Sequence, residues 1–169
     1  LRSLVEAVQG AIAPSVERIE EQDAKRLLEM QAEMELTFHF LDADQIRSGE
    51  ISSMLICQDF AKQGLLTPRT IRRDEAYQHL YLDTLYVAHR WESTKQPDTQ
   101  GVQFARIREH LDKNQGIRWV WYDYSCTPQG AQRTEEEKRQ FSAQLVNLPM
   151  LFIGCRILAL VDRTFPGAY

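Results

Sequence analysis

Apolar side chains in the second half of the chain gather in three short continuous runs. These runs span residues 82–88, 117–122 and 157–161. Uninterrupted apolar and aromatic runs are typical of strands that are covered on both faces of a parallel sheet. The pattern therefore predicts three buried strands in this half of the chain.

The segments between these runs have helical spacing. Apolar residues recur on one face from Phe104 to Leu111, and again from about residue 141 to 148. Thr134 and Glu137 form a capping box that begins the second helix, and Pro149 is expected to break it. The order strand, helix, strand, helix, strand requires right-handed crossovers, so we expect parallel strands with the first strand between the other two.

The first half of the chain has helical periodicity. Apolar residues from 16 to 41 recur at about 3.6 residues per turn, which predicts a long amphipathic helix, and a further helix is expected at 52–63, closed by Gly64 before a turn at Thr67 and Pro68. An apolar stripe on the long helix is expected to dock on another protein or on further chain: Leu27, Met30, Met34 and Phe38. We therefore predict an all-helical region at 1–78 and an α/β domain at 79–169.

Charge and composition argue against several classes of protein. The formal net charge is -4, and the basic residues form no stripe, so a nucleic acid partner is not expected. The chain has 3 cysteines without CxxC spacing, which favours an intracellular, reducing compartment over a disulfide framework or a zinc site. No apolar run approaches the roughly 20 residues that span a bilayer, which leaves peripheral membrane association open.

Polar and aromatic residues follow the first two predicted strands directly. Because the carboxyl ends of parallel strands share the edge where α/β proteins bind ligands, these residues are expected to converge in one cleft. The candidates for ligand binding are His89, Arg90, Trp91, Glu92, Asp123, Tyr124, Ser125 and Cys126. An arginine fork suits a phosphate and a carboxylate suits ribose hydroxyls. The alternative is a set of ion pairs that caps the strand ends.

Individual residues at this edge have two interpretations each. The aromatic rings of Trp91 and Tyr124 suit base stacking, although such rings more often fill a core. Cys126 beside His89 suits a thiolate nucleophile, although a lone cysteine is more often a buried filler. Asp123 and Asp162 suit a hydrated magnesium ion, or else they cap helices, and no metal site is predicted.

The segment from Asp42 to Ile51 is similar to an EF-hand calcium loop. With Gly49 as the sharp-turn glycine, however, Leu55 occupies the twelfth position, where calcium requires a bidentate glutamate. A degenerate helix-loop-helix without metal is the preferred interpretation.

Four motifs carry a resemblance to a known group of domains. They are Tyr86–Glu92, Pro97–Asp98, Val120–Gln129 and Arg133–Glu137. Together they resemble a large, poorly characterised group of TIR-like α/β domains that is abundant in unicellular algae and also occurs in bacteria. The resemblance covers residues 82–169.

This resemblance implies a three-layer flavodoxin/TIR-like parallel sheet. TIR domains carry either an assembly surface or an NAD-cleaving site, whose glutamate lies in a helix after the third strand. No such helix follows the third strand before Tyr169, so we expect the sheet to be incomplete at its C-terminus, with its missing partners beyond that residue. No cofactor is expected, although the resemblance leaves NAD or another nucleotide open.

Three classes of function follow from these observations. The first is a non-catalytic interaction or scaffold subunit of a larger, possibly organellar, complex that docks through the helical arm and the TIR-like domain. The second is a fragment of a TIR-type NAD nucleosidase or nucleotide-binding enzyme. The third is a degenerate EF-hand-like regulator. The first is the prediction, and the chain by itself is expected to be inactive toward NAD because Glu92 lies in a loop and Glu109 points outward.

Overall fold

The computed structural model describes residues 35–93 and 96–161. Contacts divide the chain into two compact units, 1–35 and 36–169. The described elements, in chain order, are β1 (Glu35–Asp42), α2 (Ala43–Ser48), α3 (Cys57–Lys62), β2 (Leu66–Arg72), α4 (Arg73–Tyr77), β3 (Tyr81–His89), α5 (Val102–Lys113), β4 (Trp119–Trp121), α6 (Asp123–Cys126), α7 (Glu135–Gly154) and β5 (Cys155–Leu160).

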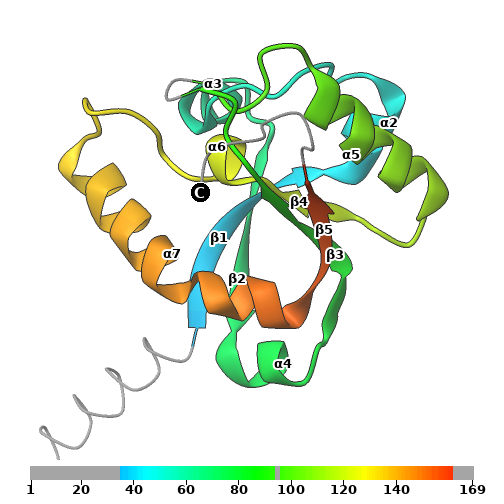
Figure 1. The fold of residues 1–169 in the computed structure, drawn as a ribbon. Coiled ribbons are helices and arrows are strands. Elements are labelled where there is room, and N and C mark those ends of the chain that lie inside the picture. Colours follow the sequence, from blue (N-terminus) through cyan, green and yellow to red (C-terminus); the bar gives the residue numbers. More distant parts are fainter. Residues whose placement is uncertain (1–34, 94–95, 162–169) are drawn as a thin grey trace, which may run out of the picture. The chain divides into compact units, whose positions relative to one another are not determined.

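A mixed sheet organises the described part of the chain. It has five strands in the order β2-β1-β4-β3-β5. Figure 1 shows α5 and α7 on opposite sides of this sheet. Opposite sides are what right-handed crossovers require, because the chain moves from β3 to β4 in one direction and returns over β3 to β5 in the other. The protein therefore belongs to the α/β class.

The central strand is β3, as the three apolar runs predict. It pairs in parallel with β4, where Leu85 lies opposite Val120, and in parallel with β5, where Val87 lies opposite Leu158. Both Leu85 and Val120 are fully buried. The prediction of a parallel three-strand block with the first strand in the middle is confirmed.

The prediction of a fully parallel sheet is wrong. β1 pairs with β4 in the antiparallel direction, with Leu41 opposite Val120. The partner on this side of the block therefore comes from before β3 in the chain, where a helical region was expected. Antiparallel neighbours need no crossover, so the sequence pattern of the βα units could not reveal β1.

The prediction that the long helix continues to residue 41 is also wrong, because residues 35–42 form β1. Phe38 and Leu41 fit both a helical period and a strand, but Phe38 and Phe40 alternate with the polar Thr37 and His39, and both phenylalanines are fully buried. Aromatic and β-branched residues favour strands, and here the two-residue period prevails because one face of β1 packs into the core. Leu27, Met30 and Met34 lie outside the described residues. Phe38 is therefore the one residue of the expected docking stripe whose position the structure describes.

The remainder of the expected helical region is mixed as well. Residues 66–72 form β2, at one edge of the described sheet, where Pro68 can be tolerated because an edge strand has backbone N–H groups that need no ladder partner. The helix expected at 52–63 is shorter, since α3 begins at Cys57. Gly64 has φ 69°, the left-handed conformation expected just after this helix.

Helix α7 begins as predicted and ends later than predicted. Thr134 and Glu137 form the capping box, but Pro149 lies inside a helix that continues to Gly154. Tertiary packing offsets the hydrogen bond that proline removes, because Leu151 is fully buried after it and the backbone of Gly154 lies against Ala76 of α4. No helix in the described ranges is long and apolar enough to cross a membrane.

Candidate functional site

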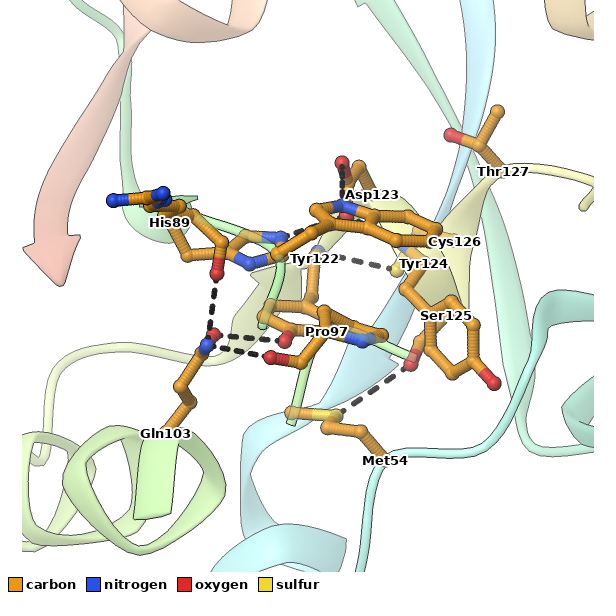
Figure 2. A network of polar contacts seen from close by, with 12 residues as sticks. Met54, His89, Pro97, Gln103, Tyr122, Asp123, Tyr124, Ser125, Cys126 and Thr127 are labelled. Carbon is orange, nitrogen blue, oxygen red and sulfur yellow. Dashed lines mark hydrogen bonds and ion pairs between the residues drawn. The ribbon is translucent and has the colours of Figure 1, made fainter. Parts of the chain in front are cut away.

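The carboxyl ends of β3 and β4 bring together a histidine and an aspartate. His89 ends β3, and Asp123 is the first residue of α6, directly after β4. The Nε2 atom of His89 donates to Oδ1 of Asp123 at 2.7 Å, and Nε1 of Trp91 donates to Oδ2 at 3.2 Å (Figure 2). The same carboxylate accepts from the backbone N–H of Tyr124. Asp123 is therefore the centre of the polar edge.

His89 and Asp123 differ sharply in their access to water. The side chain of His89 is 2% exposed and that of Asp123 is 41% exposed. The imidazole stacks on the ring of Tyr122, with 4.1 Å between ring centroids and 17° between planes. Since a carboxylate only accepts, Nε2 carries the proton, and Nδ1 is buried without a partner among the described residues.

Gln103 of α5 ties the loop after β3 to the end of β4. Its Nε2 atom donates to the backbone oxygens of Arg90 and Pro97, at 2.9 and 2.7 Å, and its Oε1 atom accepts from the hydroxyl of Tyr122 at 3.0 Å (Figure 2). Burial and the nearby carboxylates, Asp98 first, raise the pKa of Tyr122, so this hydroxyl stays protonated and continues to donate. All polar atoms of the Gln103 side chain are thus engaged in holding structure.

Two further carboxylates hold this loop. Asp98 is buried and accepts from the backbone N–H groups of Gln103 and Phe104, at 3.0 and 2.7 Å, so it caps the N-terminus of α5. Oε2 of Glu92 accepts from the backbone N–H and from the hydroxyl of Thr99. Sequence analysis named Asp98 only as part of a motif, without this role, and missed Gln103; the available signal was an aspartate shortly before the predicted helix start.

The residues after Asp123 point into the protein. The hydroxyl of Ser125 donates to the backbone oxygen of Leu55 at 2.7 Å, and Tyr124 packs edge-on against Trp91. The Sγ atom of Cys126 accepts from the backbone N–H of Tyr122 at 3.5 Å and lies 3.7 Å from the oxygen of Val120. These contacts, not an imidazole, are the partners of the sulfur.

The thiol chemistry of Cys126 follows from that position. The residue is fully buried, and desolvation by burial raises its pKa above that of an ordinary thiol. A thiolate nucleophile requires the opposite shift and access to substrate. The interpretation of Cys126 as a nucleophile paired with His89 is therefore wrong, and the interpretation as a buried filler holds.

Two hollows adjoin the polar edge on opposite sides. One is a groove of about 850 Å³ beside α5 and β5, which we call the α5–β5 groove; it is lined by Arg90, Trp91, Glu92, Val102 and Arg106, among others, and by residues 158–161. The other has about 200 Å³ and is called the α7 cavity; it is lined by Trp91, Trp121, Asp123, Phe141, Gln144 and Leu148, among others.

The predicted site residues are thus divided between these hollows. Arg90 and Glu92 line the α5–β5 groove, Asp123 lines the α7 cavity, and Trp91 lines both. His89 lines neither hollow and is a buried hydrogen-bond partner of Asp123. Ser125 faces neither, because its hydroxyl is directed toward Leu55.

The calcium-loop interpretation fails on the backbone. Residues 43–48 form the helix α2, Asp42 caps it by accepting from the N–H of Asp44, and Asp44 pairs with Arg47 at 2.6 Å. The segment before Asp42 is a strand, so the helix-loop-helix interpretation is also wrong. In the described part of the chain, no group of three or more His, Cys, Asp or Glu side chains is placed to hold a metal ion. Asp162 lies outside the described residues.

Comparisons of the chain with models of protein families, with curated proteins and with solved structures find no match.

Proposed function

We propose that this chain is a non-catalytic interaction module of a larger assembly, and that it binds an extended segment of a partner protein in the α5–β5 groove. The observation that carries the proposal is the engagement of the polar edge with itself. His89, Trp91 and the N–H of Tyr124 hold Asp123, while Glu92 holds Thr99. Side chains that are committed to holding a loop have little freedom to perform acid–base chemistry.

A histidine oriented by an aspartate is the arrangement that activates a nucleophile in many hydrolases. Here the neighbouring hydroxyl of Ser125 donates to a backbone oxygen, and the thiol of Cys126 is buried with a raised pKa. Neither group supplies a nucleophile to His89. The pair is therefore better explained as a structural clamp between β3 and α6.

The charges that line the groove favour a protein over a phosphate. Glu109 accepts from Lys113 at 2.7 Å and from Arg106 at 2.9 Å, and these two partners lower its pKa. A phosphate site needs a surplus of positive charge, whereas these cations are already matched on the surface of α5. Paired charges around an apolar strand resemble the polar rim and apolar centre of a protein interface.

Strand β5 supplies the apolar part of this surface. It pairs with β3 on one side, and no described strand pairs with its other side. Val161, just after it, is 81% exposed, and Val102 on the opposite wall is also exposed. An unpaired strand edge beside a groove with one apolar wall is the surface to which extended peptides add, because backbone hydrogen bonds supply affinity and alternate side chains supply specificity.

Relationship to TIR-like domains is part of the proposal. The parallel block β4-β3-β5 supports it, since a flavodoxin-like sheet places the first strand of such a block between the second and the third. The antiparallel β1 departs from that pattern. A reducing, intracellular compartment fits the three cysteines, which are all free and buried.

The first experiment separates a scaffold from an enzyme. Purified protein is incubated with NAD, and nicotinamide release is followed by chromatography. We expect no turnover. Turnover that Glu92→Gln abolishes would contradict the proposal and establish the NAD-cleaving alternative.

The second experiment tests the groove itself. A photo-crosslinking amino acid is placed at Val161 or, as the matched control, at Val146 of α7, which is 78% exposed and lies outside the groove. In cells that make the full-length protein, we expect a discrete protein adduct from position 161 that an Ala159→Arg substitution in the groove removes. Equal labelling at both positions, or an adduct that Ala159→Arg leaves unchanged, would refute the groove as the docking surface.

A further inference from the structure

One end of the α5–β5 groove carries more positive than negative charge. Helix α5 joins the parallel strands β3 and β4, so it runs antiparallel to β5, and its last turns lie toward the start of that strand. Arg106, Glu109 and Lys113 of α5 line the groove. Arg156 comes two residues before Leu158, which also lines it, and therefore shares the same face of β5. Three cations and one carboxylate thus gather at this end among the described residues.

His110 lies close enough to two of these cations for their charges to act on it. Burial lowers the pKa of this imidazole below its ordinary value of 6.5, and the charges of Arg156 and Lys113 lower it further. His110 lines the groove and is therefore neutral at pH 7. The surplus of positive charge at this end comes from the arginines and the lysine alone.

The opposite end of the groove is apolar and has no such surplus. Arg90 and Glu92, which follow β3, carry opposite charges there. Val102, at the start of α5, is 53% exposed, and Val161, just after β5, is 81% exposed. A segment that lies along the groove therefore meets an apolar end and a cationic end.

The position of Glu109 determines which anions the cationic end can accept. Its Oε1 and Oε2 atoms accept from Lys113 and Arg106, whose side chains are 70% and 67% exposed. A phosphate that approached both cations would also approach this carboxylate, which repels a dianion. In an extended segment, alternate side chains lie on one face about 7 Å apart, so two singly charged carboxylates can each meet one cation at a distance from Glu109.

We propose that the segment bound in the α5–β5 groove is acidic. It is an extended strand whose carboxylates lie opposite Arg106, Lys113 and Arg156, and whose apolar side chains contact Val102 and Val161. The inference rests on the proposed docking function and specifies the chemistry of its partner. Complementary charges at an exposed surface contribute more to the choice of partner and to the association rate than to affinity, so salt should weaken the preference for acidic segments.

The test selects ligands from a library of random short peptides, with the purified protein as the target. Each selected peptide is synthesised, and a second version carries amides in place of its carboxylates. Amide hydrogen exchange of β5 reports whether a peptide adds to this strand. We expect the selected peptides to slow exchange in β5 and to carry an excess of Asp and Glu. At low salt they should bind about 5-fold more tightly than their amide versions, and at about 0.5 M salt almost equally.

Charge variants of the groove test the same preference from the side of the protein. Arg106→Gln combined with Lys113→Gln should remove the preference for acidic peptides. Glu109→Gln should increase it, because the carboxylate between the two cations is lost. The matched control is Lys138→Gln combined with Arg139→Gln on α7, where a lysine and an arginine also pair with glutamates of their own helix but lie outside the groove. The control should leave the preference unchanged.

The outcomes separate this inference from the docking function on which it rests. Peptides that slow exchange in β5 without an excess of acidic residues would overturn the inference and leave the docking function standing. Peptides that bind without an effect on β5, or a library that yields no binder, would overturn both. Displacement of an acidic peptide by inorganic phosphate, under conditions in which chloride of equal ionic strength has no effect, would assign the cationic end to a phosphate and also overturn the inference.

Discussion

The pairing of His89 with Asp123 makes an asymmetric prediction about stability. The side chain of His89 is 2% exposed, and its Nδ1 atom already has no partner among the described residues. Asp123→Ala removes the partner of Nε2 as well, so both ring nitrogens would be buried without a hydrogen bond. Removing the histidine in His89→Phe leaves a carboxylate that is 41% exposed and can be hydrated. The first variant should therefore be much less stable than the second.

The magnitudes follow from the contacts that each variant loses. Asp123→Ala removes the hydrogen bonds from His89, from Trp91 and from the N–H of Tyr124. Hydrogen bonds to charged groups contribute about 1.5–3 kcal/mol and an unsatisfied buried group costs about 1–3 kcal/mol, so after allowance for solvent around the carboxylate we expect a loss of about 2–4 kcal/mol. His89→Phe keeps the ring stacked on Tyr122 and removes a buried unsatisfied nitrogen, so a change within about 1 kcal/mol is expected.

Urea unfolding followed by circular dichroism measures both variants. With a slope of about 2 kcal/mol per molar urea, Asp123→Ala should lower the midpoint by about 1–2 M and His89→Phe by less than about 0.5 M. In the double variant, the added cost of Asp123→Ala should be smaller, because no buried imidazole is left behind. Asp59→Ala, at an exposed carboxylate paired with Lys62, is the control and should change little. A larger loss in His89→Phe than in Asp123→Ala would refute the reasoning.

Three further predictions concern the frame around the site. Asp98→Ala should cost about 2–3 kcal/mol in urea unfolding, because two backbone N–H groups at the start of α5 lose their acceptor, and Asp112→Ala on the exposed face of the same helix should cost almost nothing. Gly154→Ala should cost about 1–3 kcal/mol, because a Cβ atom there would lie 2.9 Å from a backbone atom of α4, while the open position Gly116 should accept alanine without loss. Burial raises the pKa of Cys57 from 9.0 to about 12, so this thiol ionises in the unfolded chain at a lower pH than in the folded protein. The free energy of unfolding should therefore fall as the pH rises from about 9 to 12. Alkylation of Cys57 at pH 8 should be slow in the folded protein and fast in urea, and rapid labelling of the folded state would contradict the burial.

The parallel block was predictable because its signal is local. The largely apolar runs at 82–88 and 117–122 are typical of strands that are covered on both sides. The helices between them start and stop at recognisable positions, such as the capping box at Thr134. Because each of these strands is joined to the next by a helix, the three strands must be parallel, and β3 must lie between β4 and β5. This inference needs no information about contacts between distant segments.

The meeting of His89 with Asp123 was predictable, but the single cleft expected for all the candidates was not found. That His89 and Asp123 would lie at one sheet edge follows from their places after neighbouring strands. The packing of α5 decides which of these side chains is buried. It also decides that Asp98 and Gln103 hold the loop after β3. The division into a groove and a cavity likewise depends on the side of the sheet that each helix covers.

The sequence by itself determined the α/β class, the three parallel strands and the polar edge that follows two of them, because each depends on residues that are neighbours in the chain. Only the tertiary structure decided that residues 35–42 form a strand, since Phe38 and Leu41 satisfy a helical and an extended period alike, and the antiparallel contact with β4 selects between them. Tertiary packing also decided that α7 continues through Pro149 and that Nε1 of Trp121 and Oε1 of Gln144 are buried without a partner among the described residues. Such features depend on contacts between segments distant in sequence, whose energies exceed the local preferences that a sequence pattern records.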